Sequence, residues 1–192
     1  WGTRGSIPVA LTADGVRYKI VAALRGASGR TFANDAEAGA YVDSLAFADR
    51  ATFGGHSPCV EIETGGPDFV ICDLGSGVRP FGQAALARDG GGPRTYHVFL
   101  SHVHWDHIMG LPFFTPLLQH GAHLDIYAPT QEDGSSPSEA LHASIGPPLF
   151  PTGLKALPGN NAVHGVADDE RTHGEHTMNS RLNPHAGDTP GF

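Results

Sequence analysis

The chain has 192 residues, of which 40% are hydrophobic and 17% are charged, a composition typical of one soluble globular domain. Its formal net charge of −8 disfavours a broad electrostatic surface for nucleic acid. No apolar stretch approaches the roughly 20 residues needed to cross a bilayer, which argues against a membrane protein.

The two cysteines, Cys59 and Cys72, lie in apolar, strand-like runs and lack the spacing of a metal site. This pattern predicts buried, unpaired thiols and a reducing compartment, the cytoplasm. The chain begins at Trp1 without an initiator methionine or a signal sequence. We therefore interpret its start as cut, which leaves a lost targeting segment open.

The first part of the chain predicts a strand end, a Gly-rich turn and then helices. Residues 2–8 contain the turn signals, and residues 16–26 mix apolar and basic side chains in a way that a helix accommodates. Asn34 is a good N-cap, Glu37 follows three residues later, and apolar residues then recur at helical spacing. We expect residues 17–50 to form a helical element inserted between two strands.

The middle of the chain predicts alternating strands and helices. We expect a hairpin with strands at 59–64 and 69–73, a helix at 79–88, and further buried strands at 96–101 and 124–128. Residues 129–175 are rich in Gly, Pro, Ser, Asn and His. No apolar run there is long enough to predict a strand, and so long an unstructured loop is uncommon in a compact domain. Either the segment is mobile or its elements are not visible in the sequence pattern.

Three histidines and an aspartate follow the strand at 96–101 within six residues, in the run His102-Val103-His104-Trp105-Asp106-His107. Side chains two residues apart on an extended backbone point to the same face, so His102 and His104 can share one ion. The chain must then turn, which lets Asp106 and His107 hold a second ion. Neutral imidazole and carboxylate suit Zn²⁺, with Mn²⁺ or Fe²⁺ as alternatives.

Such a cluster has a chemical use. Two divalent ions about 3.5–4 Å apart can share a hydroxide, because the metal lowers the pKa of bound water from 15.7 to about 7. Two other interpretations are surface histidines brought close by chance and a purely structural zinc site. Structural sites favour cysteine ligands and four closed positions, and the motif has no cysteine nearby.

This motif resembles the His-x-His-x-Asp-His hallmark of the metallo-β-lactamase superfamily. Further segments are similar to one branch of it, the ribonuclease Z-like and cyclic-phosphodiesterase-like hydrolases; these are residues 2–8, 53–62, 72–77 and 107–114. The resemblance covers residues 1–128 well and 129–192 weakly. We treat residues 1–192 as a single domain of this kind.

The resemblance implies an α/β (α+β) fold, a four-layer αββα sandwich with a dinuclear metal site at one edge of the paired sheets. His102 and His104 then bind the first metal, and Asp106 and His107 bind the second and act in catalysis. Asp73 supports the metal loop by hydrogen bonding, as outer-shell carboxylates do. The alternative interpretation is that Asp73 belongs to an Asp-Leu-Gly turn at the end of a strand.

The resemblance also implies a third histidine for the first metal. His185, in Leu-Asn-Pro-His-Ala-Gly-Asp, is our candidate, although Pro184 stands where the family often has histidine. His173 and His176 are the competing pair. The family's bridging aspartate and last histidine would lie beyond Phe192, so we interpret the chain as a fragment or a product truncated in its second half.

We therefore predict a metal-dependent hydrolase of phosphodiesters, with a small or cyclic nucleotide favoured over tRNA. The substrate class rests on the resemblance of residues 2–8 and 110–112, because esters, thioesters and lactams are hydrolysed at similar clusters. Nucleic acid is disfavoured by the charge, and a homodimer is left open. Two alternatives are a sulfur- or oxygen-linked oxidoreductase on the same fold and a truncated, non-catalytic remnant.

Overall fold

The computed structural model describes residues 1–131, 133–166, 169–173, 176–185 and 187–191, with the backbone alone for Asp89 and for most residues after Val166. The chain divides into two compact units. Trp1–Pro8 and His56–Phe192 form the first unit, which we call the body. Val9–Gly55 forms the second unit, which we call the helical arm.

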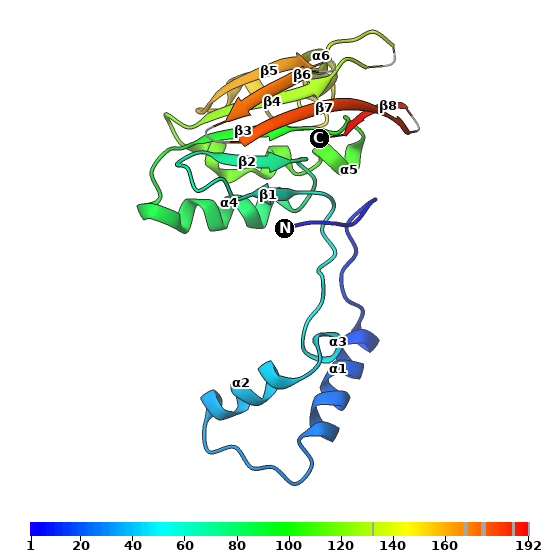
Figure 1. Ribbon diagram of the computed structural model, residues 1–192, viewed down its shortest axis with the longest axis vertical. Coiled ribbons are helices and arrows are strands. Elements are labelled where there is room, and N and C mark those ends of the chain that lie inside the picture. Colours follow the sequence, from blue (N-terminus) through cyan, green and yellow to red (C-terminus); the bar gives the residue numbers. More distant parts are fainter. Residues whose placement is uncertain (132, 167–168, 174–175, 186, 192) are drawn as a thin grey trace. The chain divides into compact units, whose positions relative to one another are not determined.

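A five-stranded sheet organises the body (Figure 1). Its strands lie side by side in chain order: β1 (Val60–Ile62), β2 (Phe69–Cys72), β3 (Thr95–Phe99), β4 (His123–Pro129) and β5 (Asn160–Val166). The hairpin pair β1 and β2 is antiparallel, and the other three pairs are parallel. Parallel neighbours require crossover connections, and in this sheet those connections contain the helices.

The crossover helices are mostly short. They are α4 (Val78–Ala87) and η1 (Arg88–Gly90) before β3, α5 (Trp105–Ile108), η2 (Leu111–Phe113) and η3 (Thr115–Leu118) before β4, and α6 (Pro137–Ser144) and η4 (Leu154–Ala156) before β5. Buried side chains from α4, α5, α6 and the turns between them join one core with buried strand residues. The architecture is therefore mixed α/β.

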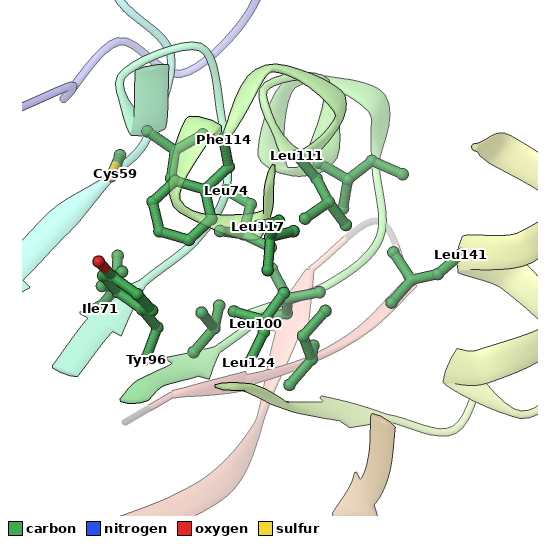
Figure 2. Packing of buried hydrophobic residues seen from close by; sticks show 14 of the residues in the cluster. Cys59, Ile71, Leu74, Tyr96, Leu100, Leu111, Phe114, Leu117, Leu124 and Leu141 are labelled. Atoms are coloured by element: carbon green, nitrogen blue, oxygen red, sulfur yellow. The ribbon is translucent and has the colours of Figure 1, made fainter. Parts of the chain in front are cut away.

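The sequences of β2, β3 and β4 contain apolar residues at consecutive positions because these strands have buried side chains on both faces of the sheet. Ile71, Tyr96 and Leu124 face the helices and pack with Phe114 and Leu117 (Figure 2). The alternate strand positions form a smaller apolar cluster on the opposite face of the sheet, made of Val70, Phe99, Tyr127 and Val166. Strands buried on both faces lose the simple in–out alternation of a half-exposed sheet.

The last part of the body contains a second sheet of three antiparallel strands. They are β6 (Asp169–His173), β7 (His176–His185) and β8 (Gly187–Gly191), in that order. The backbone of β8 comes close to β4 of the first sheet.

The helical arm contains α1 (Ala13–Gly26), α2 (Asp35–Ser44) and α3 (Phe47–Arg50). Thr12 caps α1 by accepting a hydrogen bond from the Gly15 N–H, and Asn34 caps α2 in the same way from Glu37. None of the three helices contains a buried residue. No helix in the described part of the chain combines the length and apolar character that crossing a bilayer requires.

The two ends of the arm meet. The Val9 N–H donates a hydrogen bond to the Gly55 carbonyl oxygen at 2.9 Å. A Cβ atom on Gly55 would lie 1.5 Å from the Val9 carbonyl oxygen, so only glycine permits this approach. The first and last residues of the arm therefore lie next to each other.

Most of the predicted elements are confirmed, including the hairpin, the helix capped by Asn34, the helix near 79–88 and the inserted helical element. Within residues 129–175, where the sequence has no apolar run long enough to predict a strand, the structure contains α6, β5 and β6. Ser136 and Glu139 form a capping box that starts α6, a local signal that the sequence analysis missed. β5 has few apolar residues and is held by its backbone pairing with β4.

Candidate metal centre

The histidine motif lies just beyond the end of a central strand. β3 ends at Phe99, earlier than expected, but the Leu100 N–H still donates to the Tyr127 carbonyl oxygen at 2.8 Å and keeps the chain extended. His104 has extended backbone angles and immediately precedes the short helix α5, which contains Asp106 and His107. The predicted ligands therefore occupy an extended segment followed by one helical turn.

Asp73 follows the last residue of β2 and adopts a left-handed backbone conformation with φ of 63°. Aspartate is one of the few residues other than glycine that tolerate this region. The Asp73 N–H donates to the Phe99 carbonyl oxygen at 3.0 Å. Because Cys72 pairs with Phe99 in parallel register, the side chain of Asp73 comes to lie beside Ser101.

The Asp73 carboxylate is buried and holds the start of the motif loop. The Ser101 N–H and hydroxyl donate to its Oδ1 at 2.8 and 2.9 Å. His107 Nδ1 lies 2.9 Å from its Oδ2. An ionised carboxylate only accepts hydrogen bonds, so Nδ1 of His107 carries the hydrogen and the lone pair of a neutral ring is left on Nε2.

The same contacts raise the pKa of His107. Burial alone lowers it, but the hydrogen bond to Asp73 and the negative charges of Asp73 and Asp106 outweigh the burial, so the pKa lies above its ordinary value of 6.5. An imidazole must be neutral to bind a metal ion. A proton and a cation would therefore compete for Nε2 of His107.

The structure brings the four predicted motif ligands together. The ring of His102 lies 4.3 Å from that of His104 and 4.1 Å from that of His107, measured between centroids. His107 Nε2 lies 3.4 Å from Asp106 Oδ2. His102 is 8% exposed, so the cluster has one buried side.

The donor set suits a divalent cation by its chemistry, since it contains three imidazoles and a carboxylate. Among the residues that the structure describes, however, no group of three or more His, Cys, Asp or Glu side chains is placed to hold an ion as it stands. His102 Nδ1 lies 3.0 Å from the Ser101 hydroxyl, and His107 Nε2 faces Asp106. Side-chain rotations are needed to aim three donors at one point.

Backbone contacts hold the loop against the end of β2. The Leu74 N–H donates to the His107 carbonyl oxygen at 2.8 Å, and the Gly110 N–H donates to the Leu74 carbonyl oxygen at 2.9 Å. A Cβ atom on Gly110 would lie 2.1 Å from the Gly75 carbonyl oxygen. Glycine at position 110 is therefore a packing requirement of this loop.

Several other histidines lie outside the motif. The side chains of His185, His173 and His176 lie outside the described residues, so their role as a further ligand stays a prediction. His56 is exposed, and its Nδ1 lies 3.0 Å from the Ser76 hydroxyl. His123 is the first residue of β4.

Sequence reasoning missed Ser101. Its hydroxyl contacts Asp73 and lies 3.0 and 3.2 Å from Nδ1 of His102 and His107, respectively. The available signal was a hydroxyl residue placed directly before the first histidine, at the end of a buried strand.

Comparisons of the chain with family models, curated proteins and solved structures found no match.

Proposed function

We propose that the chain is a metal-dependent hydrolase acting on phosphodiesters, similar to the ribonuclease Z-like and cyclic-phosphodiesterase-like branch of the metallo-β-lactamase superfamily. One observation supports this proposal above the others. The buried Asp73 carboxylate holds Ser101 and His107 by hydrogen bonds, beside a cluster that contains His102 and His104. An outer-shell carboxylate that fixes a ligating histidine is a recurrent feature of metal sites.

In this proposal His102 and His104 hold one ion, and Asp106 and His107 hold a second. Zn²⁺ suits these donors, with Mn²⁺ or Fe²⁺ as alternatives. A bound ion supplies a hydroxide at neutral pH and stabilises negative charge that develops on the substrate. Asp73 keeps the hydrogen of His107 on Nδ1, and Ser101 limits the rotation of both His102 and His107.

The substrate class is proposed from the resemblance and from charge. Residues 110–112, on which the substrate class partly rests, begin with Gly110, and a Cβ atom on Gly110 would lie 2.1 Å from the Gly75 carbonyl oxygen in the loop after β2. The net charge of −8 opposes binding of a long polyanion, because every phosphate contact depends on neutralising cations. A small or cyclic nucleotide diester is therefore the preferred substrate.

We further propose that the two sheets are the inner layers of an αββα sandwich. The crossover helices pack on one face of the five-stranded sheet. The other face carries its own apolar cluster, and β8 of the second sheet lies close to β4. An experimental structure would test this, because in an αββα sandwich a helix layer covers the outer face of the second sheet.

The competing proposal is a non-catalytic protein that holds little metal. It is supported by the present pairing of the donors within the cluster, where His107 Nε2 faces Asp106 rather than a shared centre. Measuring zinc per chain after purification and after dialysis against Zn²⁺ separates the two proposals. Near-zero content in both samples would favour the non-catalytic protein.

The deciding experiment is the hydrolysis of bis(p-nitrophenyl) phosphate with added Zn²⁺ or Mn²⁺. We expect the parent chain to be active and His104→Ala to lose roughly 100-fold or more in rate, as expected when a metal ligand is removed. His120→Ala is the matched control, because His120 is an exposed histidine outside the motif. Equal rates for the parent and His104→Ala would remove the proposed mechanism.

A further inference from the structure

Ser101 lies between the buried carboxylate of Asp73 and two histidines of the motif. Its hydroxyl oxygen lies 2.9 Å from Asp73 Oδ1 and 3.1 Å from Asp73 Oδ2. The same oxygen lies 3.0 Å from His102 Nδ1 and 3.2 Å from His107 Nδ1. A hydroxyl group has one hydrogen to donate and two lone pairs with which to accept. The position of that single hydrogen therefore determines the state of its neighbours.

His107 does not accept the Ser101 hydrogen. Its Nδ1 lies 2.9 Å from Asp73 Oδ2, and an ionised carboxylate only accepts hydrogen bonds. Nδ1 of His107 must therefore carry a hydrogen of its own and has no lone pair to offer. The Ser101 hydroxyl is left with two acceptors, the Asp73 carboxylate and Nδ1 of His102.

Charge favours the carboxylate over the imidazole as the acceptor. A hydrogen bond to an ionised group is roughly twice as strong as one between neutral groups. Asp73 and His102 are each 8% exposed, and a low local dielectric strengthens the interaction with the charge further. When the Ser101 hydroxyl donates to Asp73, its lone pairs remain for His102, and Nδ1 of His102 must then be the donor.

We propose that Ser101 is a positioning residue that extends the influence of Asp73 to His102. The Ser101 hydroxyl accepts a hydrogen bond from Nδ1 of His102, so a neutral His102 keeps its hydrogen on Nδ1 and its lone pair on Nε2. Asp73 holds His107 in the same form by direct contact. One carboxylate thus sets the tautomer of two histidines, one directly and one through a hydroxyl group.

Both proposed ion positions then depend on the same buried carboxylate. His102 belongs to the first position and His107 to the second, and their rings lie 4.1 Å apart between centroids. A metal ion binds the ring nitrogen that carries the lone pair, and the hydrogen bond of the other nitrogen fixes which one that is. Nε2 is therefore the ligating atom of both rings. This consequence rests on the proposed function, whereas the hydrogen positions themselves require no metal ion.

The first test determines the two tautomers in the whole, metal-free chain. Long-range ¹H–¹⁵N NMR distinguishes ring nitrogens with a hydrogen from those without, and at about pH 9 an ordinary histidine with a pKa near 6.5 is neutral. We expect the hydrogen on Nδ1 in both His102 and His107. His120, an exposed histidine outside the motif, is the internal control and should carry its hydrogen mainly on Nε2, as a free imidazole side chain does. Loss of signals in His102→Gln and His107→Gln assigns the spectra.

Three substitutions separate the role of Ser101 from that of Asp73. In Ser101→Ala the hydrogen of His102 should move to Nε2, while His107, which Asp73 holds directly, keeps its hydrogen on Nδ1. Asp73→Asn should change both histidines, because it removes the acceptor of His107 and the charge that orients the Ser101 hydroxyl. Ser101→Thr retains the hydroxyl and should show the parent's tautomers. A general loosening of the loop would not produce this selective change at His102.

The second test measures Zn²⁺ affinity by competition with a chromophoric chelator. Ser101→Ala should bind Zn²⁺ about tenfold or more weakly, as expected when a partner of a ligating histidine is lost. Ser101→Thr should remain close to the parent. Ser144→Ala is the matched control, since Ser144 is a partly buried serine in α6 whose hydroxyl donates to the Ala140 carbonyl oxygen.

The two tests separate failure of this inference from failure of the proposed function. A hydrogen on Nε2 of His102 in the metal-free parent would overturn the inference, and so would an unchanged His102 tautomer in Ser101→Ala. A parent chain with the expected tautomers that binds no Zn²⁺ would support the hydrogen positions and remove the proposed function. The parent spectrum alone decides the state of His102, so the inference stays testable even where a variant fails to fold.

Discussion

The body and the helical arm use apolar residues in opposite ways. In the body, Phe81, Tyr96 and Leu124 are fully buried because strands and crossover helices form layers that cover one another. In the arm, Ile20 and Leu24 are as apolar but remain exposed. The comparison shows that good helix caps produce helices without producing a core, and that an interior requires a second layer.

The largest predicted contrast between the two units is in aromatic truncation. Phe81→Ala removes a fully buried ring packed against Tyr96 and Phe114 and should lower the free energy of unfolding by about 3–5 kcal/mol. Phe53 in the arm is 86% exposed, so Phe53→Ala should change that free energy by about 0.5 kcal/mol or less. Urea denaturation measures both, and equal losses would erase the contrast.

The reaction rates of cysteine thiols provide a second comparison of the body and the arm. Burial raises the pKa of Cys59 to about 12 and that of Cys72 to about 11, with the charge of Asp73 contributing to both. Ser28 is exposed in the turn after α1. In Ser28→Cys, the new thiol should react with iodoacetamide near pH 8 on the order of 10³-fold faster than Cys59, because an ordinary thiol ionises near pH 8.5. Mass spectrometry of each cysteine peptide over time provides the rates, and comparable rates would show that Cys59 is as accessible to the reagent as an exposed thiol.

Substituting one carboxylate in each unit tests whether the hydrogen bonds of Asp73 support metal binding. Asp73→Asn removes the acceptor that fixes Ser101 and His107 and should weaken Zn²⁺ binding about 10–100-fold. Asp43→Asn in α2 is the control, since Asp43 is exposed in the arm and should leave the affinity unchanged. Competition with a chromophoric chelator measures the affinity, and equal values for the two variants would remove the assigned role of Asp73.

The smallest predicted effect concerns pH. Burial raises the pKa of Glu61, but hydrogen bonds from Arg88 and Trp1 and the charge of Arg88 outweigh it, so the pKa lies below its ordinary 4.5. The native state therefore gains stability from the ionised Glu61 above about pH 4.5, and this gain is lost as the pH falls through the lowered pKa.

Glu61→Gln should remove about 1 kcal/mol of stability at neutral pH and progressively less in acid. Arg88→Gln and the double variant complete a mutant cycle that isolates the Glu61–Arg88 pair. Thermal unfolding at neutral and acidic pH provides the values. A loss of stability that is the same at neutral and acidic pH would contradict the stabilising role of the ionised Glu61 side chain.

The strands and capped helices were predictable because their signals are local. Val70 and Ile71 belong to a short apolar run bounded by turn residues, and Asn34 with Glu37 marks a helix start. The start of α6 was signalled as well, by Ser136 and Glu139, but the Gly- and Pro-rich surroundings concealed it. β5 could not be found in this way, because its position depends on pairing with β4.

The candidate site was predictable only in its motif residues. The spacing of His102 to His107 is visible in the sequence, whereas the contact of Asp73 with Ser101 spans 28 residues and depends on the parallel register of β2 and β3. The left-handed backbone of Asp73 also has no local signal beyond the tolerance of aspartate for that region. Pairing geometry, rather than composition, supplies the rest of the network.

The hydrogen bond between Val9 and Gly55 makes the arm a removable module. Its two ends are joined at 2.9 Å, so excising residues 10–54 leaves a gap that a short linker closes without moving any strand. Gain or loss of the arm therefore requires no redesign of the sheet.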